Sequence, residues 1–386
     1  AQCSLNSAWQ RAKDQNDATL AMPAFQDIID IRRLEVESRG FEGGDYETYL
    51  EFVEPEIPLQ SLKDLIFPTS AQLFSYVPKA VALQQSHGPL LELPCIPSQT
   101  LNDIIVHVVS DLGFDLTRGT IEPSTTSCCV PISEGKVRLF YSEKTNFLDT
   151  ILSAIHEAGH GMYDQGKGDN ACPTNQLISM GLHESQARFW ECMVGKSRGF
   201  MQYLHGVLLE HAPESTREIT PDTLWRYANA VSPQELRIGS DDLTYNQHIV
   251  VRMIVEEALV SGELDAVNLP IRWNELYEQY LQLNPASDVV GVLQDLHWLD
   301  GHFGYFTSYA LGNIFAAQLY WAMQGELGNQ EFLVEQGNFK DIHQWLASNI
   351  YRNGCRLNSF DLIEKVTGAM PSGQLLVAHV VEALGL

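Results

Sequence analysis

The chain is short of positive charge. Its 386 residues include 24 Lys and Arg against 49 Asp and Glu, which gives a formal net charge of -25 and a pI of about 4.7. A protein that binds nucleic acid through its phosphates needs a basic surface, so this composition argues against a nucleic-acid partner. The charge is instead typical of a soluble protein with an acidic, solvated surface.

Long apolar runs and compact cysteine patterns are also missing. No stretch approaches the roughly 20 apolar residues that a membrane-spanning helix needs, and no signal-peptide pattern is visible. We therefore expect a cytoplasmic protein with no membrane partner. The seven cysteines show neither a disulfide-scaffold pattern nor the spacing of a zinc knuckle, which favours buried free thiols in a reducing compartment.

Apolar residues recur at helical spacing along most of the chain and make up 45% of it, enough for a large core. Repeats and low-complexity linkers are absent, so we predict a mainly α fold in one domain over residues 1–386. Its parts are N-terminal helices over 1–112, a small β-sheet over 113–143 and a helical core over 144–386. The β prediction rests on clustered Gly, Pro, Ser and Thr and on the alternation of polar and apolar residues in 136–141.

Several predicted helices have boundaries that the structure can test. Separate helices are predicted over 59–67 and 71–86. One long helix is predicted over 182–195, and another over 327–347.

The most informative segment is the run HEAGH at residues 156–160, which fits the pattern HEXXH. This order places two imidazoles on one face of a helix, at the spacing that two ligands of one Zn²⁺ require, with a glutamate between them. Asn146 is the predicted N-cap, with Asp149 three residues later as in a capping box, and Gly166 is the predicted C-terminal stop. The motif therefore lies on a predicted helix, like that of the zincins.

Three side chains are predicted metal ligands. His156 and His160 come from the motif, and Glu184 follows His160 by 24 residues, which allows a turn and a returning helix to bring its carboxylate back. The fourth coordination position then stays open for water, as in a catalytic rather than a structural zinc site. Glu157 is the predicted general base for that water. We predict Zn²⁺, and Co²⁺ would fit the same donors.

Further segments resemble the carboxypeptidase Taq family of zinc metallocarboxypeptidases. They are HESQ at 183–186, LRIGSD at 236–241, GVLQDLHW at 291–298 and FGYF at 303–306. The third fits the family pattern GXXQDXHW fully, and the second corresponds to IRXXAD. The resemblance covers most of the chain.

The chain departs from the family pattern in four places. The HPF motif, expected near residues 126–128, is absent, and the DXRXT motif, expected near 136–140, keeps only Arg138. Leu236 and Ser240 replace the Ile and Ala of IRXXAD. Family members also have a longer N-terminal region, so a shortened N-terminus is expected here.

The resemblance implies a largely helical fold with a deep active-site groove, often as a homodimer, and removal of single residues from peptide C-termini. Under it the metal ligands carry over as His156, His160 and Glu184, with Glu157 as general base. Arg237, at the arginine of IRXXAD, is the predicted partner of the substrate's terminal carboxylate, because a bidentate arginine is the cation best suited to that task. The alternative for Arg237 is a salt bridge to Asp241 or Asp242.

Four further residues are predicted to act on the peptide substrate. Tyr305 is the first candidate and His297 the second for hydrogen bonding to the oxyanion that develops during hydrolysis; the alternative for both is a place in an aromatic core. His248 and Tyr309 are predicted to bind substrate. His183 can line the groove. Six other histidines show no partner pattern, and we interpret them as surface or core residues: His87, His107, His205, His211, His343 and His379.

Two other functions stay open. A zinc endopeptidase or oligopeptidase shares the same metal chemistry but does not need Arg237. A non-catalytic peptide-binding protein that retained the metal would explain the altered motifs, but it would not require Glu157. Asp164 and Asp241 are candidate acceptors for the second ring N–H of the ligand histidines; the alternative for each is an ordinary exposed aspartate.

Overall fold

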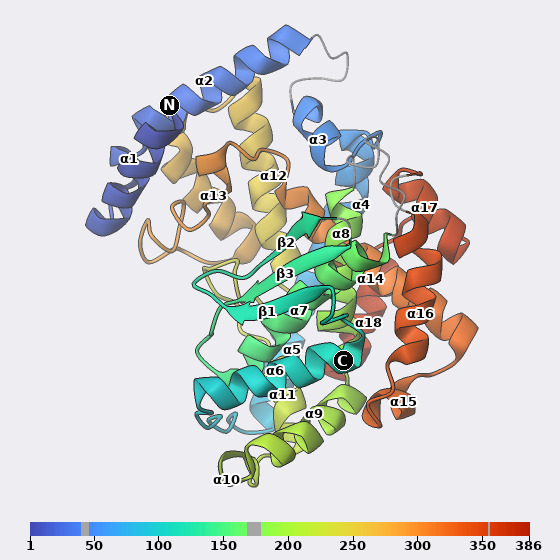
Figure 1. Ribbon diagram of the computed structural model, residues 1–386. Helices are drawn as coiled ribbons and strands as arrows, with labels where there is room; N and C mark the ends of the chain where they lie inside the picture. The colour runs from blue at the N-terminus through green and yellow to red at the C-terminus, as the bar shows by residue number, and fades with distance from the viewer. Residues whose placement is uncertain (40–45, 134, 168–178, 354–355) are drawn as a thin grey trace. The chain divides into compact units, whose positions relative to one another are not determined.

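The computed structural model describes residues 1–39, 46–133, 135–167, 179–353 and 356–386 (Figure 1). The fold is mainly helical with one small sheet, which confirms the predicted class. The chain divides into two compact units, the first formed by Ala1–Val81 with Val231–Ala310 and the second by Ala82–Ala230 with Leu311–Leu386. A single domain over 1–386 stays a prediction.

Helices make up the regular structure in the described part of the first unit. They are α1 (Gln2–Gln15), η1 (Ala18–Leu20), α2 (Met22–Arg39), α3 (Glu47–Val53), α4 (Leu59–Ser75), α12 (Tyr245–Ser261), η4 (Ala266–Asn268), α13 (Leu269–Leu281) and η5 (His297–Asp300), with the beginnings of α5 (Val77–Ser86) and α14 (Phe306–Leu327). Helix α12 packs against α2, α4 and α13. Its side chains are buried almost all round, so it forms the centre of this unit.

Helix α4 runs through Pro68, and the break predicted after residue 67 is wrong. A proline in a helix removes one backbone hydrogen bond and crowds the preceding turn. Here Leu62, Ile66 and Leu73 are fully buried on the face that packs against the core. Burial of that apolar face holds the helix together across the proline, which the local sequence does not reveal.

The second unit combines helices with the sheet. Its elements are α6 (Ser98–Leu112), β1 (Gly119–Pro123), β2 (Cys128–Ser133), β3 (Lys136–Tyr141), α7 (Phe147–Gly166), α8 (Met180–Arg188), η3 (Phe189–Val194), α9 (Arg198–His211), α10 (Pro213–Thr216), α11 (Pro221–Ala228), α15 (Glu331–Glu335), α16 (Lys340–Asn349), η6 (Tyr351–Asn353), α17 (Ser359–Thr367) and α18 (Gln374–Leu384), with the remainders of α5 and α14. The predicted sheet region is confirmed.

Strand β3 is the centre of the three-stranded sheet. It pairs in parallel with β1 and antiparallel with β2, with Leu139 opposite Ile121 on one side and Cys129 on the other. Val137, Leu139 and Tyr141 are buried in alternation with more exposed residues, and the buried face packs against α7 (Figure 1). The sheet therefore supports the helix that carries the HEAGH run.

Helix α7 has the ends that the sequence predicts. The side chain of Asn146 accepts a hydrogen bond from the backbone N–H of Asp149 at 2.9 Å, and the helix ends at Gly166. Most of the side chains between these ends are buried. Local capping and a broad apolar surface both favour this helix, which explains why its boundaries could be predicted.

Two predicted helices have a different form. Helix α8 gives way at Phe189 to the π-helical segment η3, so 182–195 is not one regular helix. The predicted helix over 327–347 is also interrupted. Gly328 follows the end of α14, and Gly337 separates α15 from α16; their positive φ angles of 77° and 71° end a right-handed helix. Helices α1 and α18 are not among the predicted elements.

The cysteines do not fit the prediction of buried thiols. Within the described residues five are free, and only Cys192 is buried; Cys3, Cys95 and Cys128 are exposed and Cys129 is intermediate. None of the described helices combines the length and the apolar character needed to cross a membrane.

Candidate metal site and a buried arginine pair

The three predicted metal ligands lie together in the second unit. The Nε2 atoms of His156 and His160 lie 3.9 Å and 3.6 Å from Oε2 of Glu184, and one ligand atom from each residue lies within 4.8 Å of the others. Ligand atoms of a tetrahedral zinc site, each about 2.0–2.2 Å from the metal, are roughly 3.3–3.5 Å apart. The two imidazoles and the carboxylate therefore fit one divalent cation with small side-chain adjustments.

Two glycines allow Glu184 to reach the histidines. A Cβ at Gly159, inside the HEAGH run, would lie 2.6 Å from both Cα of Ala187 and the carbonyl oxygen of Gln186. Helix α8 therefore crosses α7 at a distance that only glycine permits. Gly312 of α14 contacts the side chain of Glu184 from another direction, and its Cβ would be 2.8 Å from Cβ of Glu184.

The two histidines differ in charge without a metal. Burial lowers the pKa of His160 well below its ordinary value, and the nearby His183 and His156 lower it further. Burial also acts to lower the pKa of His156, but the carboxylates of Glu184 and Glu191 outweigh it and raise this pKa to about 9. His160 is thus ready to bind a cation, whereas His156 must first lose a proton.

Glu191 is the carboxylate that holds His156. Its Oε2 accepts a hydrogen bond from Nδ1 of His156 at 2.8 Å and another from Arg188 at 2.8 Å, while Arg188 also donates to Asn313 at 2.6 Å. A carboxylate bonded to the second ring nitrogen fixes the orientation of a ligand histidine. Sequence reasoning missed Glu191, although its position seven residues after Glu184 places both on one helical face.

Asp164 has other partners than the ligand histidines. It forms ion pairs with Lys167 and with His183, the latter at 3.7 Å, and the ring of His183 stacks on that of His160 at 4.2 Å. The acceptor role predicted for Asp164 is therefore wrong, since it reaches the site only through His183.

Glu157 is buried on the same helix, with 7% of its surface exposed. Burial raises its pKa to about 7; the charge of His156 acts to lower it, and those of Glu184 and Glu191 raise it further. A carboxylate whose pKa lies near neutrality can both accept and return a proton, which suits a general base.

In the first unit, Arg237 is paired with Asp295. Its Nε and Nη2 atoms donate to Oδ1 of Asp295 at 3.0 Å and 2.9 Å, and its Nη1 donates to Tyr245 at 3.2 Å. The alternative prediction, a salt bridge from Arg237 to Asp241 or Asp242, is wrong, because the ion-pair partner of Arg237 is Asp295. Asp241 instead accepts bonds from the backbone N–H groups of Ser232, Leu243 and Thr244, so it is also not an acceptor for a ligand histidine.

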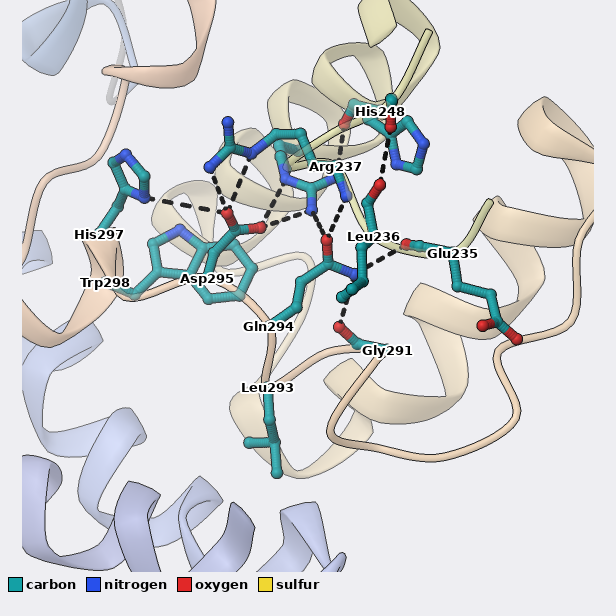
Figure 2. Close-up of polar contacts among 12 residues, drawn as sticks. Glu235, Leu236, Arg237, His248, Gly291, Leu293, Gln294, Asp295, His297 and Trp298 are labelled. Atoms are coloured by element: carbon teal, nitrogen blue, oxygen red, sulfur yellow. Dashed lines mark hydrogen bonds and ion pairs between the residues drawn. The ribbon is translucent and has the colours of Figure 1, made fainter. Parts of the chain in front are cut away.

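A second arginine, Arg252, bonds to the other oxygen of Asp295, the carboxylate that Figure 2 shows paired with Arg237. Its Nε donates to Oδ2 at 2.7 Å, and its Nη2 donates to Gln294 at 2.8 Å. The two arginines lower the pKa of Asp295 against the effect of burial and keep it ionised. Sequence reasoning missed Arg252; the signal was a charged residue inside the apolar helix α12.

The predicted substrate residues of this unit lie near that pair, and one of them, His248, accepts a bond from Arg252 at its backbone oxygen. The Nε2 atom of His297 is 3.0 Å from the hydroxyl of Tyr309, and the ring of Tyr305 lies 5.6 Å from that of His297. Burial, followed by the charge of Arg237, lowers the pKa of His297 to about 3, so this imidazole is neutral. His248 is 0% exposed and contacts Tyr277 at 3.2 Å, so it has no surface on which to meet a substrate.

Comparison with known proteins decides the family. A profile described as carboxypeptidase Taq (M32) metallopeptidase matches residues 1–384. The chain belongs to this M32 family. Carboxypeptidase 1 of Bacillus subtilis (strain 168) is 31% identical over 378 residues, which cover 97% of this chain and 75% of the relative. Thermostable carboxypeptidase 1 of Pyrococcus furiosus is 30% identical over 382 residues, covering 97% and 76%.

Solved M32 structures have the same fold. Metallocarboxypeptidase 1 of Trypanosoma cruzi matches with a TM-score of 0.92 at 28% identity, covering 99% of this chain and 78% of that one. The M32 carboxypeptidase of Deinococcus radiodurans R1 matches with a TM-score of 0.90 at 28% identity, covering 100% and 79%. The present M32 protein is accordingly a metallocarboxypeptidase, a peptide hydrolase.

Proposed function

We propose that this metallocarboxypeptidase holds Zn²⁺ between His156, His160 and Glu184 and removes single residues from the C-termini of peptides. The observation that carries the proposal is the convergence of two imidazoles and one carboxylate beside the buried Glu157. Two nitrogen ligands and one oxygen ligand form the donor set typical of catalytic zinc. Co²⁺ is the second candidate metal, since imidazole and carboxylate also bind it.

The residues of the site divide the work of hydrolysis. A bound cation supplies Lewis-acid polarisation of the scissile carbonyl and makes water acidic enough to react near neutral pH. Glu157 accepts the proton of the attacking water and returns it to the leaving amine. Glu191 keeps the His156 ring in place during these steps through its bond to Nδ1. Tyr305 and His297 are the proposed donors to the oxyanion.

Arg237 is the proposed anchor for the substrate's terminal carboxylate. A guanidinium has five N–H donors, and three of those of Arg237 bond to Asp295 and Tyr245. The others are available to a second carboxylate, with Tyr309 as a neighbour whose ring centre lies 5.0 Å from the guanidinium. Because the side chain is only 6% exposed, a substrate carboxylate would bind to one edge of the guanidinium group.

The same burial favours an alternative, a zinc endopeptidase in which Arg237 is structural. An arginine already neutralised by a buried aspartate attracts a second carboxylate less strongly than a free one does. The metal site would be unchanged in that case, and cleavage would not depend on a free C-terminus. Retention of Glu157 argues against a non-catalytic peptide-binding protein.

One peptide in two forms separates these functions. The zinc-loaded protein is incubated with the free acid and with the C-terminal amide, and products are followed by mass spectrometry. Stepwise loss of C-terminal residues from the free acid alone supports the carboxypeptidase, and internal cuts in both forms support the endopeptidase. With Arg237→Ala, the carboxypeptidase function predicts a raised KM for the free acid. A homodimer and a cytoplasmic location stay predictions.

A further inference from the structure

A second group of potential metal ligands lies in the second unit, outside the HEAGH site. His107 is on α6, and Glu210 and His211 are the last two residues of α9. One ligand atom from each of the three lies within 4.8 Å of the others. The sequence gives no hint of this group, because 103 residues separate His107 from Glu210 and only the packing of α6 against α9 joins them.

The two imidazoles face each other through their ring nitrogens. Nδ1 of His107 lies 2.9 Å from Nε2 of His211, and the ring planes are inclined at 60°. Nitrogens bound to one tetrahedral zinc ion lie roughly 3.4 Å apart. The two ring nitrogens therefore need to move apart by only about half an ångström to admit a cation. Side chains at the surface can make that adjustment. The side chain of His107 is 31% exposed, so ions can reach it from solvent.

A carboxylate already holds the far side of His107. Oδ2 of Asp111 lies 3.4 Å from Nε2 of His107, one helical turn away on α6. The same oxygen accepts a hydrogen bond from the hydroxyl of Tyr203 at 2.8 Å. A carboxylate beside Nε2 favours the tautomer that carries its proton there, which leaves Nδ1 as the acceptor that a cation needs. A cation bound at Nδ1 would complete a row of carboxylate, histidine and metal.

We propose that His107, Glu210 and His211 form a second cation site, which clamps α6 to α9. Two imidazoles and a carboxylate favour a divalent first-row transition ion, and Zn²⁺ is the one that their geometry fits best. Glu210 is exposed and completes the set from the surface. Asp111 is a positioning residue, since it acts only through His107.

Metal counting tests the proposal independently of catalysis. The apo protein is dialysed against micromolar Zn²⁺, and bound zinc per chain is measured by mass spectrometry. The wild type should bind two equivalents, and His107→Ala and His211→Ala should each bind one. His205→Ala is the matched control on α9 and should keep two. The peptidase activity of the His107→Ala protein should be unchanged.

Two additional measurements guard against misfolded variants. Glu210→Gln changes an exposed side chain at a helix end, and it should weaken the second equivalent while leaving the melting temperature of the apo protein unchanged. Asp111→Asn should weaken that equivalent by about 10- to 100-fold, as loss of a supporting carboxylate does elsewhere. The second equivalent should also raise the melting temperature of the wild type.

The proposal is overturned if the wild type binds a single equivalent that His107→Ala retains, since a direct N–H···N bond between the two imidazoles would then be the whole of their interaction. It is overturned as well if the second equivalent persists in both His107→Ala and His211→Ala. His160→Ala should instead remove the first equivalent and spare the second, so failure of one site is distinguishable from failure of the other.

Discussion

Gly312 of α14 contacts the side chain of Glu184 so closely that no Cβ fits between them. Gly312→Ala should therefore push the Glu184 carboxylate away from His156 and His160. We expect zinc affinity to fall by at least about 10-fold, as for other displaced ligands, and the melting temperature to drop because the core is overpacked. Equilibrium dialysis and calorimetry measure the two effects.

Gly325 provides the matched control on the same helix, because a Cβ there would meet nothing within 4 Å. Gly325→Ala should leave zinc affinity unchanged and stabilise the protein by about 0.5–1 kcal/mol, since alanine favours a helix over glycine. Equal zinc affinity in the two alanine variants would contradict the role assigned to Gly312.

Glu191→Gln should weaken zinc binding by about 10- to 100-fold, because the amide cannot replace the charge that orients His156. The variant should still bind zinc at high concentration, since the three ligands remain. Competition with a chromophoric chelator gives the affinity. Glu214→Gln, at an exposed position on α10, serves as the control. An equal loss of zinc affinity in this variant would show that the protein's overall charge, and not the bond to His156, causes the effect.

Glu157→Gln should lower kcat by about 10²- to 10⁴-fold, the usual contribution of a general base. Zinc content should be unchanged because Glu157 is not among the ligands. Steady-state kinetics with zinc measured on the same sample checks both statements. Activity close to that of the wild type would mean that another group accepts the proton.

Glu256 gives the protein a pH-dependent stability. It is fully buried and accepts hydrogen bonds from Trp298, Tyr46 and Gly304. Burial raises its pKa to about 7 despite those bonds. Because the pKa is higher in the folded than in the unfolded state, the stabilising contribution is complete below about pH 4.5 and is lost as the pH rises through about 7.

Glu256→Gln should remove that part of the pH dependence. The difference in unfolding free energy between the wild type and Glu256→Gln should be largest near about pH 5, where the wild type is stabilised most. At about pH 8 this difference should be smaller by up to about 3 kcal/mol. Urea unfolding at both pH values measures it. The control is Glu257→Gln, whose side chain is 35% exposed and paired with Lys63; it should show no such narrowing.

The sequence predicts those features that depend on neighbouring residues. The cap at Asn146, the stop at Gly166 and the spacing of His156 and His160 are all local, and they define α7 correctly. Glu184 is predicted as the third ligand from its distance of 24 residues beyond His160, and the family resemblance implies the same residue. The alternation of residues in 136–141 predicts β3 for the same local reason.

Local sequence patterns do not predict contacts between residues that lie far apart along the chain. Asp295 bonds to Arg252, 43 residues earlier, and His107 meets His211 at a separation of 104 residues. Neither pair has a spacing rule, because each depends on how separate helices pack. Helix α4 runs through Pro68 for a similar reason, since tertiary burial outweighs the local preference.

The π-helical segment η3 makes the metal site depend on the number of residues between α8 and α9. A π turn holds one residue more than an α turn, and Glu191 lies within it. Deleting a single residue from 189–194 would rewind this stretch as plain α-helix and rotate the next helix by about 100°. The length of this stretch therefore constrains the position of Glu191 and of α9 more tightly than the identity of the neighbouring side chains does.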